Sequence, residues 1–423
     1  MIVCHHRFLL LLQQPEGPVL GQLPLAPNWE PAVEWAAFAA LRAGGRETPP
    51  HGRVVPVADP RLGLPYLSGF RVELDGADPA PPPCEFPVTY FARDARRGSA
   101  ALVEAKKLRV GDTFSYRLIA VEQPEESSAQ PAALAFEVGE ETRPLAVTNA
   151  PLPPLFAATV PMGETDGSSA YPVFLPQAVL TEAQTLVEAA GAREVGGILL
   201  GHLQRDPALP DIGAVVTAQI PARHAVGEAE KLTFTPETWA AVEAAIRLRR
   251  SREIILGWWH SHPARFWCQD KACPPATRRA CSLQRGFFSS DDLSLHESVF
   301  AKAFHLALVV TFADEGCHHA LYGWNQGVVQ RRGFRLLPDP TDSHPPPTVA
   351  GCAPPTNPHP AEAAAAPTQE PIRESPATCQ PGEARLSPSP SHDFRRSFPV
   401  HFLHPRASPC RILETRQGTR NLT

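Results

Sequence analysis

The chain has 423 residues, and its 49 prolines are about twice the ~5% share of average soluble proteins. Hydrophobic residues make up 43% and aromatic residues 8%, which supports one or two folded cores and excludes a wholly disordered chain. The formal charge of -5, from 39 Lys and Arg against 44 Asp and Glu, argues against a dedicated nucleic-acid-binding protein.

Hydropathy and cysteine usage indicate the compartment. No segment approaches the ~18 consecutive apolar residues of a membrane helix, and the early apolar run 8–12 is too short for a signal peptide core. The nine cysteines are odd in number and scattered, as is typical of a reducing compartment. We therefore predict a soluble, cytoplasmic protein with no membrane partner and no disulfide framework.

Residues 1–150 are predicted to form a smaller, strand-rich domain whose role the sequence does not indicate. Residues 113–123 carry the aromatic and β-branched side chains of a strand, and residues 132–138 are a second candidate. Helical pattern is scarce in this region apart from residues 31–42. A proline cluster then opens a linker over residues 151–170.

Residues 171–337 are predicted to form an α+β domain. Thr235 is a suitable N-cap, because Pro236 follows at the first helical position and an apolar stripe continues at helical spacing. Further helices are expected at 181–191 and 293–304, and strands at 195–203, 213–220, 253–259 and 306–312.

Residues 338–423 are predicted to be a disordered tail. Eighteen of the 49 prolines lie from residue 336 onward, and no apolar periodicity is present there. The end of this tail, residues 393–423, is more basic and contains Phe394, Phe398 and Phe402. It is either a short docking segment or a solvated tail without a specific role.

Two histidines follow the expected strand 253–259. Residues i and i+2 of an extended chain point to the same face, so His260 and His262 project together before Pro263 ends the strand. Two imidazoles make up half of a metal site. Taken alone, such a pair is also common as a structural or surface feature.

Carboxylates that suit this pair lie in two other segments. Ser289 is a candidate N-cap, which places Asp292 in the first turn of the following helix, although the same residues also fit a simple capping box. Glu194 precedes a glycine-rich apolar strand and by itself is an ordinary strand-edge residue. His296 and Glu297 begin like the HExxH of thermolysin-type proteases, but the fifth residue is Phe300.

Together these segments resemble the JAMM (MPN+, JAB) metalloprotease family, which has a Glu on its first strand, then HSHP or HTHP, then SxxD at a helix start. The flanking phrases EVGGILLGH, KLTFTPETW and GWWHSHP resemble the bacterial branch, and the resemblance covers about residues 171–335. It implies the MPN/JAB fold, a mixed, cytidine-deaminase-like sheet flanked by helices.

The resemblance also implies a role for each matching residue. His260, His262 and Asp292 would bind Zn²⁺ and leave a fourth position to water, as in catalytic zinc sites. Glu194 would act as general base toward that water and pass its proton to the leaving amine. Ser289 would donate a hydrogen bond to the developing oxyanion.

The sequence departs from the family in the loop before Ser289. Here 26 residues (263–288) separate His262 from Ser289, more than in the family, so we expect an insertion over 264–286 at the lip of the site. Five basic residues and one acidic residue give it a local charge of +4. Its cysteines, Cys268, Cys273 and Cys281, either hold a second, structural zinc with Cys317 or His318, or are free thiols in a basic substrate-contacting loop.

The resemblance implies a zinc-dependent isopeptidase or peptidase that cleaves the amide bond after the C-terminus of a ubiquitin-like modifier or sulfur-carrier-like protein. An activating-enzyme-like protein is the further partner that it implies. Two alternatives remain open: a non-catalytic MPN scaffold within a protein complex, and a metal-dependent hydrolase of a small amide or peptide.

Overall fold

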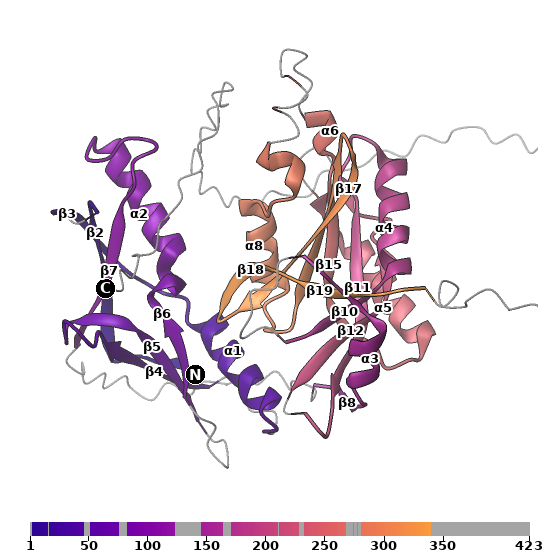
Figure 1. The fold of residues 1–423 in the computed structure, drawn as a ribbon, viewed down its shortest axis with the longest axis horizontal. Helices are drawn as coiled ribbons and strands as arrows, with labels where there is room; N and C mark the ends of the chain where they lie inside the picture. The colour runs from indigo at the N-terminus through magenta and orange to yellow at the C-terminus, as the bar shows by residue number, and fades with distance from the viewer. Residues whose placement is uncertain are drawn as a thin grey trace, which may run out of the picture. The chain divides into compact units, whose positions relative to one another are not determined.

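The computed structural model describes residues 2–15, 17–45, 51–75, 83–122, 145–163, 171–209, 211–227, 232–267, 274, 277 and 281–339. Within these ranges the protein has an α+β fold with two large sheets and a small hairpin (Figure 1). The candidate strand 132–138 and the expected tail from residue 340 onward, with Phe394, Phe398 and Phe402, lie outside the described residues.

The first sheet is built from the N-terminal part of the chain. Its seven strands are β1 (Ile2–Val3), β2 (His6–Gln13), β3 (Val19–Pro24), β4 (Gly52–Ala58), β5 (Tyr66–Leu74), β6 (Cys84–Pro87) and β7 (Ser115–Glu122). They are ordered β1-β4-β5-β7-β2-β3, with β6 on β5. The strand expected over 113–123 is confirmed as β7.

Two helices and a 3-10 turn accompany this sheet: α1 (Glu30–Arg42), η1 (Val88–Phe91) and α2 (Ala92–Glu104). The helix expected over 31–42 is confirmed as α1, and Trp35 and Phe38 of its apolar face are buried. The view that helical pattern is otherwise scarce in this region was wrong. Helix α2 is amphipathic: Ala95, Gly98, Ser99 and Leu102 are buried on one face, and arginines are exposed on the other.

The second sheet is mixed and contains β8 (Val147–Asn149), β9 (Val160–Met162), β10 (Val173–Pro176), β11 (Gly196–Arg205), β12 (Ile212–Pro221), β15 (Ile254–His262), β16 (Leu306–Ala313), β17 (Gly316–Asn325), β18 (Val328–Arg332) and β19 (Phe334–Leu337). Its order is β18-β17-β16-β15-β11-β12-β10-β19-β9, with β8 on β11, while β13 (Val226–Gly227) and β14 (Leu232–Thr233) form the hairpin. Thus β8 and β9, together with α3 (Pro153–Ala158), place residues from the expected N-terminal domain and linker beside this second sheet.

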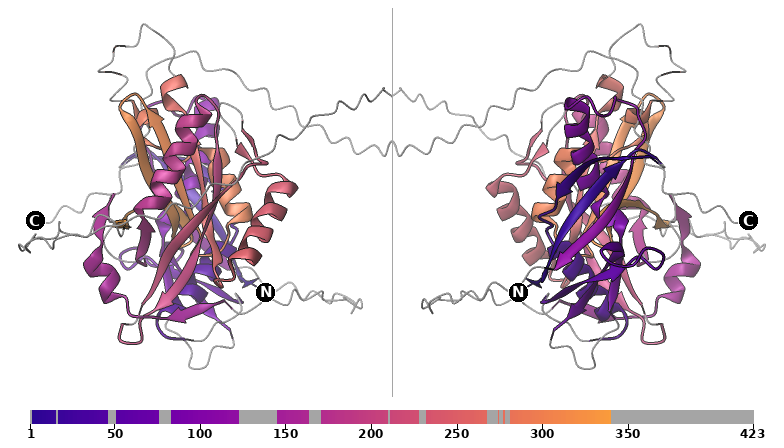
Figure 2. Two further views of the ribbon diagram at one scale, coloured as in Figure 1. Left: turned by 90° about the vertical axis from the view of Figure 1, so that its right-hand side faces the viewer. Right: turned by 90° about the vertical axis from the view of Figure 1, so that its left-hand side faces the viewer.

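Helices cover both faces of the second sheet. Side chains alternate between the two faces along each strand. On one face, Leu199 and Leu308 lie in a core with α4 (Gln177–Ala190). On the other face, Ile198 and Val309 lie in a core with α5 (Pro236–Arg249) and the region of α8 (Ser290–Val299). In the left view of Figure 2, α4 lies in front of the strands. A side chain on the sheet face covered by α8 therefore packs among residues from both strands and helices.

The structure confirms most of the elements expected in this region and corrects two boundaries. Thr235 is the N-cap of α5, with its side chain accepting from the Thr238 N–H. Helix α4 starts at Gln177 rather than Thr181, because Pro176 ends β10 in an extended conformation and leads directly into the helix. Helix α8 ends at Val299 rather than Phe304, since Phe300 leaves the helical conformation.

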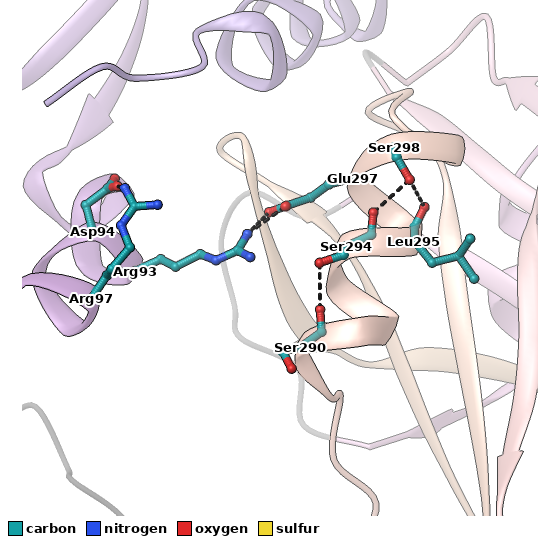
Figure 3. A network of polar contacts seen from close by, with 8 residues as sticks. All are labelled: Arg93, Asp94, Arg97, Ser290, Ser294, Leu295, Glu297 and Ser298. Carbon is teal, nitrogen blue, oxygen red and sulfur yellow. Dashed lines mark hydrogen bonds and ion pairs between the residues drawn. The ribbon is translucent and has the colours of Figure 1, made fainter. Parts of the chain in front are cut away.

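Polar pairs and an aromatic cluster join the first-sheet region to the second. Arg42 of α1 forms an ion pair with Asp211 at 2.8 Å, and Arg93 of α2 pairs with Glu297 of α8 at 2.6 Å (Figure 3). Phe38 of α1 packs edge-on against the buried Tyr171, 5.2 Å between ring centroids. Helices α1 and α2 therefore carry contacts between the two sheet regions, and the Arg93–Glu297 pair is the one of these that reaches α8.

Among the described helices, none combines the length and apolar character needed to span a membrane. The cytoplasmic location stays a prediction.

Candidate metal centre

The end of strand β15 places both histidines inside the molecule. His260 and His262 are 0% and 2% exposed, and they alternate with Ser261 so that both rings face α8. The strand pairs in parallel with β16, where His262 is opposite Thr311. Gly257 makes this close pairing feasible, because a Cβ there would lie 1.9 Å from the carbonyl oxygen of Leu306.

The start of helix α8 supplies the carboxylate. Ser289 caps the helix: its Oγ accepts from the Asp292 N–H at 3.0 Å, and Asp292 Oδ2 accepts from the Ser289 N–H at 2.8 Å. The capping box that the sequence also suggested is therefore confirmed. The same carboxylate also reaches β15, with Oδ1 3.0 Å from His260 Nε2 and Oδ2 3.4 Å from His262 Nε2. The cap thus fixes the side chain that faces the histidines.

These three residues fit a tetrahedral metal. Among the described residues they are the one group of His, Cys, Asp and Glu whose ligand atoms cluster, all within 4.8 Å of one another. The two Nε2 atoms are 3.0 Å apart. Zn–N bonds of ~2.0–2.1 Å in a tetrahedral site separate ligand atoms by ~3.3 Å, close to all three observed separations. Two imidazoles and one carboxylate are also the donor types of catalytic zinc sites.

Electrostatics favours the ligand forms of two of the three groups. Burial lowers the pKa of His262 and outweighs the hydrogen bond to Asp292, which acts in the opposite direction. The imidazole is therefore neutral near pH 7. Desolvation alone would raise the pKa of Asp292, but His260 and the hydrogen bonds from His260, His262 and the Ser289 N–H outweigh it and hold that pKa well below its usual range. A neutral imidazole and an ionised carboxylate are the forms that bind metal.

Glu194 lies two residues before strand β11, which pairs with β15. Gly196 pairs with His260, and Ser261 continues the ladder by donating its N–H to the Val195 carbonyl at 2.8 Å. Glu194 precedes Val195 in the chain, so the backbone of the two segments runs side by side up to this point. Glu194 is only 4% exposed. It is therefore a buried carboxylate close in the chain to the strand that pairs with the histidines, and it is not one of the three residues of the ligand cluster.

Aromatic rings surround the histidines. The indole of Trp258 stacks on His260 with 4.5 Å between centroids and 14° between planes. Phe287 lies 4.6 Å and Trp267 lies 5.2 Å from the His262 ring, centroid to centroid. These contacts shield the two imidazoles from water on the sides that the rings cover. The sequence analysis did not assign any of these aromatics to the site.

Both ends of the 264–286 insertion are held by one side chain. Gln284, 7% exposed, donates to the Ala264 carbonyl at 3.0 Å, and its Oε1 accepts from the Asp314 N–H at 3.2 Å. The described start of the insertion is the short helix α6 (Ala264–Trp267), and its end contains η2 (Ser282–Arg285). Despite the insertion, Asp292 meets the histidines, with Ser289 as its helix cap.

The hypothesis of a second, structural zinc concerns the three cysteines of the insertion. Cys268 and Cys273 lie outside the described residues, while Cys281 is a partly buried free thiol. Cys317 and His318 join no metal-sized cluster within the described part of the chain. They line instead a cavity of about 700 Å³ near the β16–β17 turn, together with Gln284 and Arg285, and this cavity does not include the three candidate ligands.

Comparisons with known proteins add little to this picture. No family model and no curated protein matches the chain. A solution structure of a protein from Desulfitobacterium hafniense is similar over 39% of this chain and 92% of that chain, with 17% identity and a TM-score of 0.27.

Proposed function

We propose that the protein is a zinc-dependent isopeptidase or peptidase with an MPN/JAB-type catalytic domain. The observation that carries this proposal is the convergence of His260, His262 and Asp292 from a strand end and a helix start. Glu194, two residues before the neighbouring strand β11, is buried. A mixed sheet with helices on both faces is compatible with that fold.

His260, His262 and Asp292 would hold the metal through two Nε2 atoms and one carboxylate. Bound zinc would polarise the scissile carbonyl and lower the pKa of a water toward ~7. Glu194 would accept a proton from the attacking water and deliver it to the leaving nitrogen, yielding a carboxylate and an amine. Ser289 Oγ accepts from the Asp292 N–H, so its own hydrogen is free to bond the carbonyl oxygen of the substrate as negative charge develops there.

The proposed substrate is an amide bond after the C-terminus of a ubiquitin-like or sulfur-carrier-like protein, with an activating-enzyme-like protein as a further partner. The support for this class is the resemblance of residues 171–335 to the JAMM family. The +4 charge of the insertion next to the site suits an acidic segment of a substrate protein.

The deciding experiment measures metal content and cleavage in the same preparations. Purified wild type should bind about one zinc per chain and cleave a fusion of a ubiquitin-like protein to a reporter, and a chelator should stop cleavage. Glu194→Gln should keep the zinc and lose cleavage by a factor of at least ~10². The matched control is Glu243→Gln, at an exposed position on α5, and this variant should cleave normally.

The two alternatives predict different results. A scaffold would bind partners without cleaving any fusion, even when zinc is bound. A small-amide hydrolase would cleave short acyl-amides and leave the folded fusion protein intact. A wild-type protein that binds no zinc would overturn every enzymatic reading.

A further inference from the structure

The indole of Trp258 links the candidate ligand His260 to helix α8. One face of the indole stacks on the His260 ring, 4.5 Å away and 14° from parallel, and Phe300 stacks nearly parallel on it at 5.8 Å and 12°. Its Nε1–H donates to Nδ1 of His296 at 3.1 Å. The indole is therefore fixed by rings and by one directional hydrogen bond.

His296 is buried where it can accept that hydrogen bond in its neutral form. It is 0% exposed and lies on α8, four residues after Asp292, where its ring also contacts Phe300 and Trp324. Burial lowers the pKa of His296 to about 3, so the imidazole stays neutral near pH 7. Acceptance at Nδ1 requires the tautomer that carries its proton on Nε2.

One helix thus reaches the metal cluster by two routes. Asp292 faces the histidines directly, and His296, one turn further along, holds the indole against which His260 is stacked. His260 Nδ1 has no hydrogen-bond partner among the described residues. Of the ring contacts of His260, the stack with Trp258 is the shortest and the most nearly parallel, whereas His262 and Phe288 meet the ring at an angle. Outer contacts of this kind orient the ligands of metal sites.

We propose that His296 is a positioning residue: by accepting from Trp258, it sets the ring orientation of His260 and thereby the affinity for the metal. This inference rests on the metal site of the proposed function and adds a residue to it. The ring and hydrogen-bond contacts of His296 are with Trp258, Phe288, Phe300 and Trp324, and it is not one of the three candidate ligands.

Two isosteric substitutions test the hydrogen bond separately from packing. His296→Asn keeps an acceptor near the position of Nδ1, whereas His296→Leu has a similar shape and no acceptor. We expect His296→Leu to weaken zinc binding ~10-fold or more, within the ~10–100-fold range of outer-shell losses, and His296→Asn to restore most of it. Zinc affinity is measured by competition with a chromophoric chelator.

Spectroscopy adds a readout that general destabilisation does not move. The Trp258 indole N–H resonance, assigned by its absence in Trp258→Phe, should shift upfield in His296→Leu and stay near its wild-type position in His296→Asn. In the Co²⁺-loaded protein, the visible absorption bands should change for His296→Leu alone. His305→Leu is the control, because its partly buried ring contacts Phe300 and Phe304 without bonding Trp258.

The double variant Trp258→Phe/His296→Leu separates the indole route from any other effect of His296. If the route is correct, adding His296→Leu to Trp258→Phe causes no further loss of zinc affinity. Three outcomes would overturn the inference while zinc binding by the wild type stays intact. They are additive losses of zinc affinity in the double variant, equal zinc affinities of His296→Leu and His296→Asn, and a loss of zinc affinity in His305→Leu as large as that in His296→Leu. Absence of zinc from the wild type would instead overturn the proposed function, and this inference with it.

Discussion

Oδ1 of Asp292 lies 3.0 Å from Nε2 of His260, although the whole 264–286 insertion separates the two residues in the chain. The strand end and the helix start that carry them are each fixed locally. His260 belongs to the ladder of β15 with its neighbours, and Asp292 is held by the capping box with Ser289. Neither anchor depends on the insertion itself, which explains how the site tolerates it.

Asp292→Asn should separate the two roles of this carboxylate. The amide oxygen can still accept from the Ser289 N–H, so the cap and the thermal unfolding midpoint should be nearly retained. The anionic ligand is lost, and zinc affinity should fall by more than the ~10–100-fold typical of outer-shell changes. Metal titration measures the loss of zinc affinity, and thermal denaturation of the metal-free protein measures whether the cap is retained. Asp291→Asn, at the exposed neighbouring position, should change neither.

Gln284→Ala should destabilise the fold, because it removes the partner of the Ala264 carbonyl and of the Asp314 N–H. A buried polar group left unpaired costs about 1–3 kcal/mol, so we expect the free energy of unfolding to fall by about 2 kcal/mol. Urea denaturation measures it. Leu283→Ala, at a neighbouring side chain with 41% exposure, should cost much less; an equal cost would mean that the hydrogen bonds of Gln284 are not the cause.

The metal-free protein should lose stability as the pH falls from about 6.5 to about 4. Burial lowers the pKa of His296 to about 3 and that of His305 to about 4, below the value of ~6.5 for an unfolded chain. Between these limits the unfolded state binds more protons, so each histidine contributes up to ~1.4 kcal/mol per pH unit. Urea midpoints at several pH values test this. His305→Gln should reduce the slope, and an unchanged slope would contradict the assignment.

The two ion pairs between the sheet regions should differ in strength. Arg42 bonds Asp211 through two nitrogens, with side chains 18% and 33% exposed, whereas the Arg93 and Glu297 side chains are 57% and 38% exposed. Double-mutant cycles should give ~0.2–1 kcal/mol for the exposed pair, reduced by salt, and a larger coupling for the bidentate pair. The reverse order would show that exposure does not govern these contacts.

Local signals predicted much of the second sheet region. Thr235 and Pro236 correctly marked the start of α5, and the apolar runs of β11, β12 and β16 gave their strands. Helix α2 was missed although its sequence carries helical periodicity, with small residues and Leu102 buried on one face and arginines exposed on the other. Because most of the buried residues are small, large apolar side chains alone do not mark this helix.

The sequence also predicted, through the types and order of the residues, that His260, His262 and Asp292 of the candidate metal centre come together. It did not predict the part played by Trp258 or His296. Strand parity could have placed Trp258 on the face of His260, since the two are separated by one residue. The bond to His296 depends on how α8 packs over the sheet, which no local pattern records.

The order β15, α8, β16, with the two strands parallel and adjacent, is a β-α-β crossover. In such a unit the chain leaves the carboxyl end of the first strand and must enter its helix at the same edge, so His262 and Asp292 meet by topology. The 264–286 insertion occupies the strand-to-helix connection of this unit. Loops at that position can lengthen without disturbing the core, while every added residue emerges beside the ligands. This connection is therefore the natural place to graft new recognition elements onto the domain.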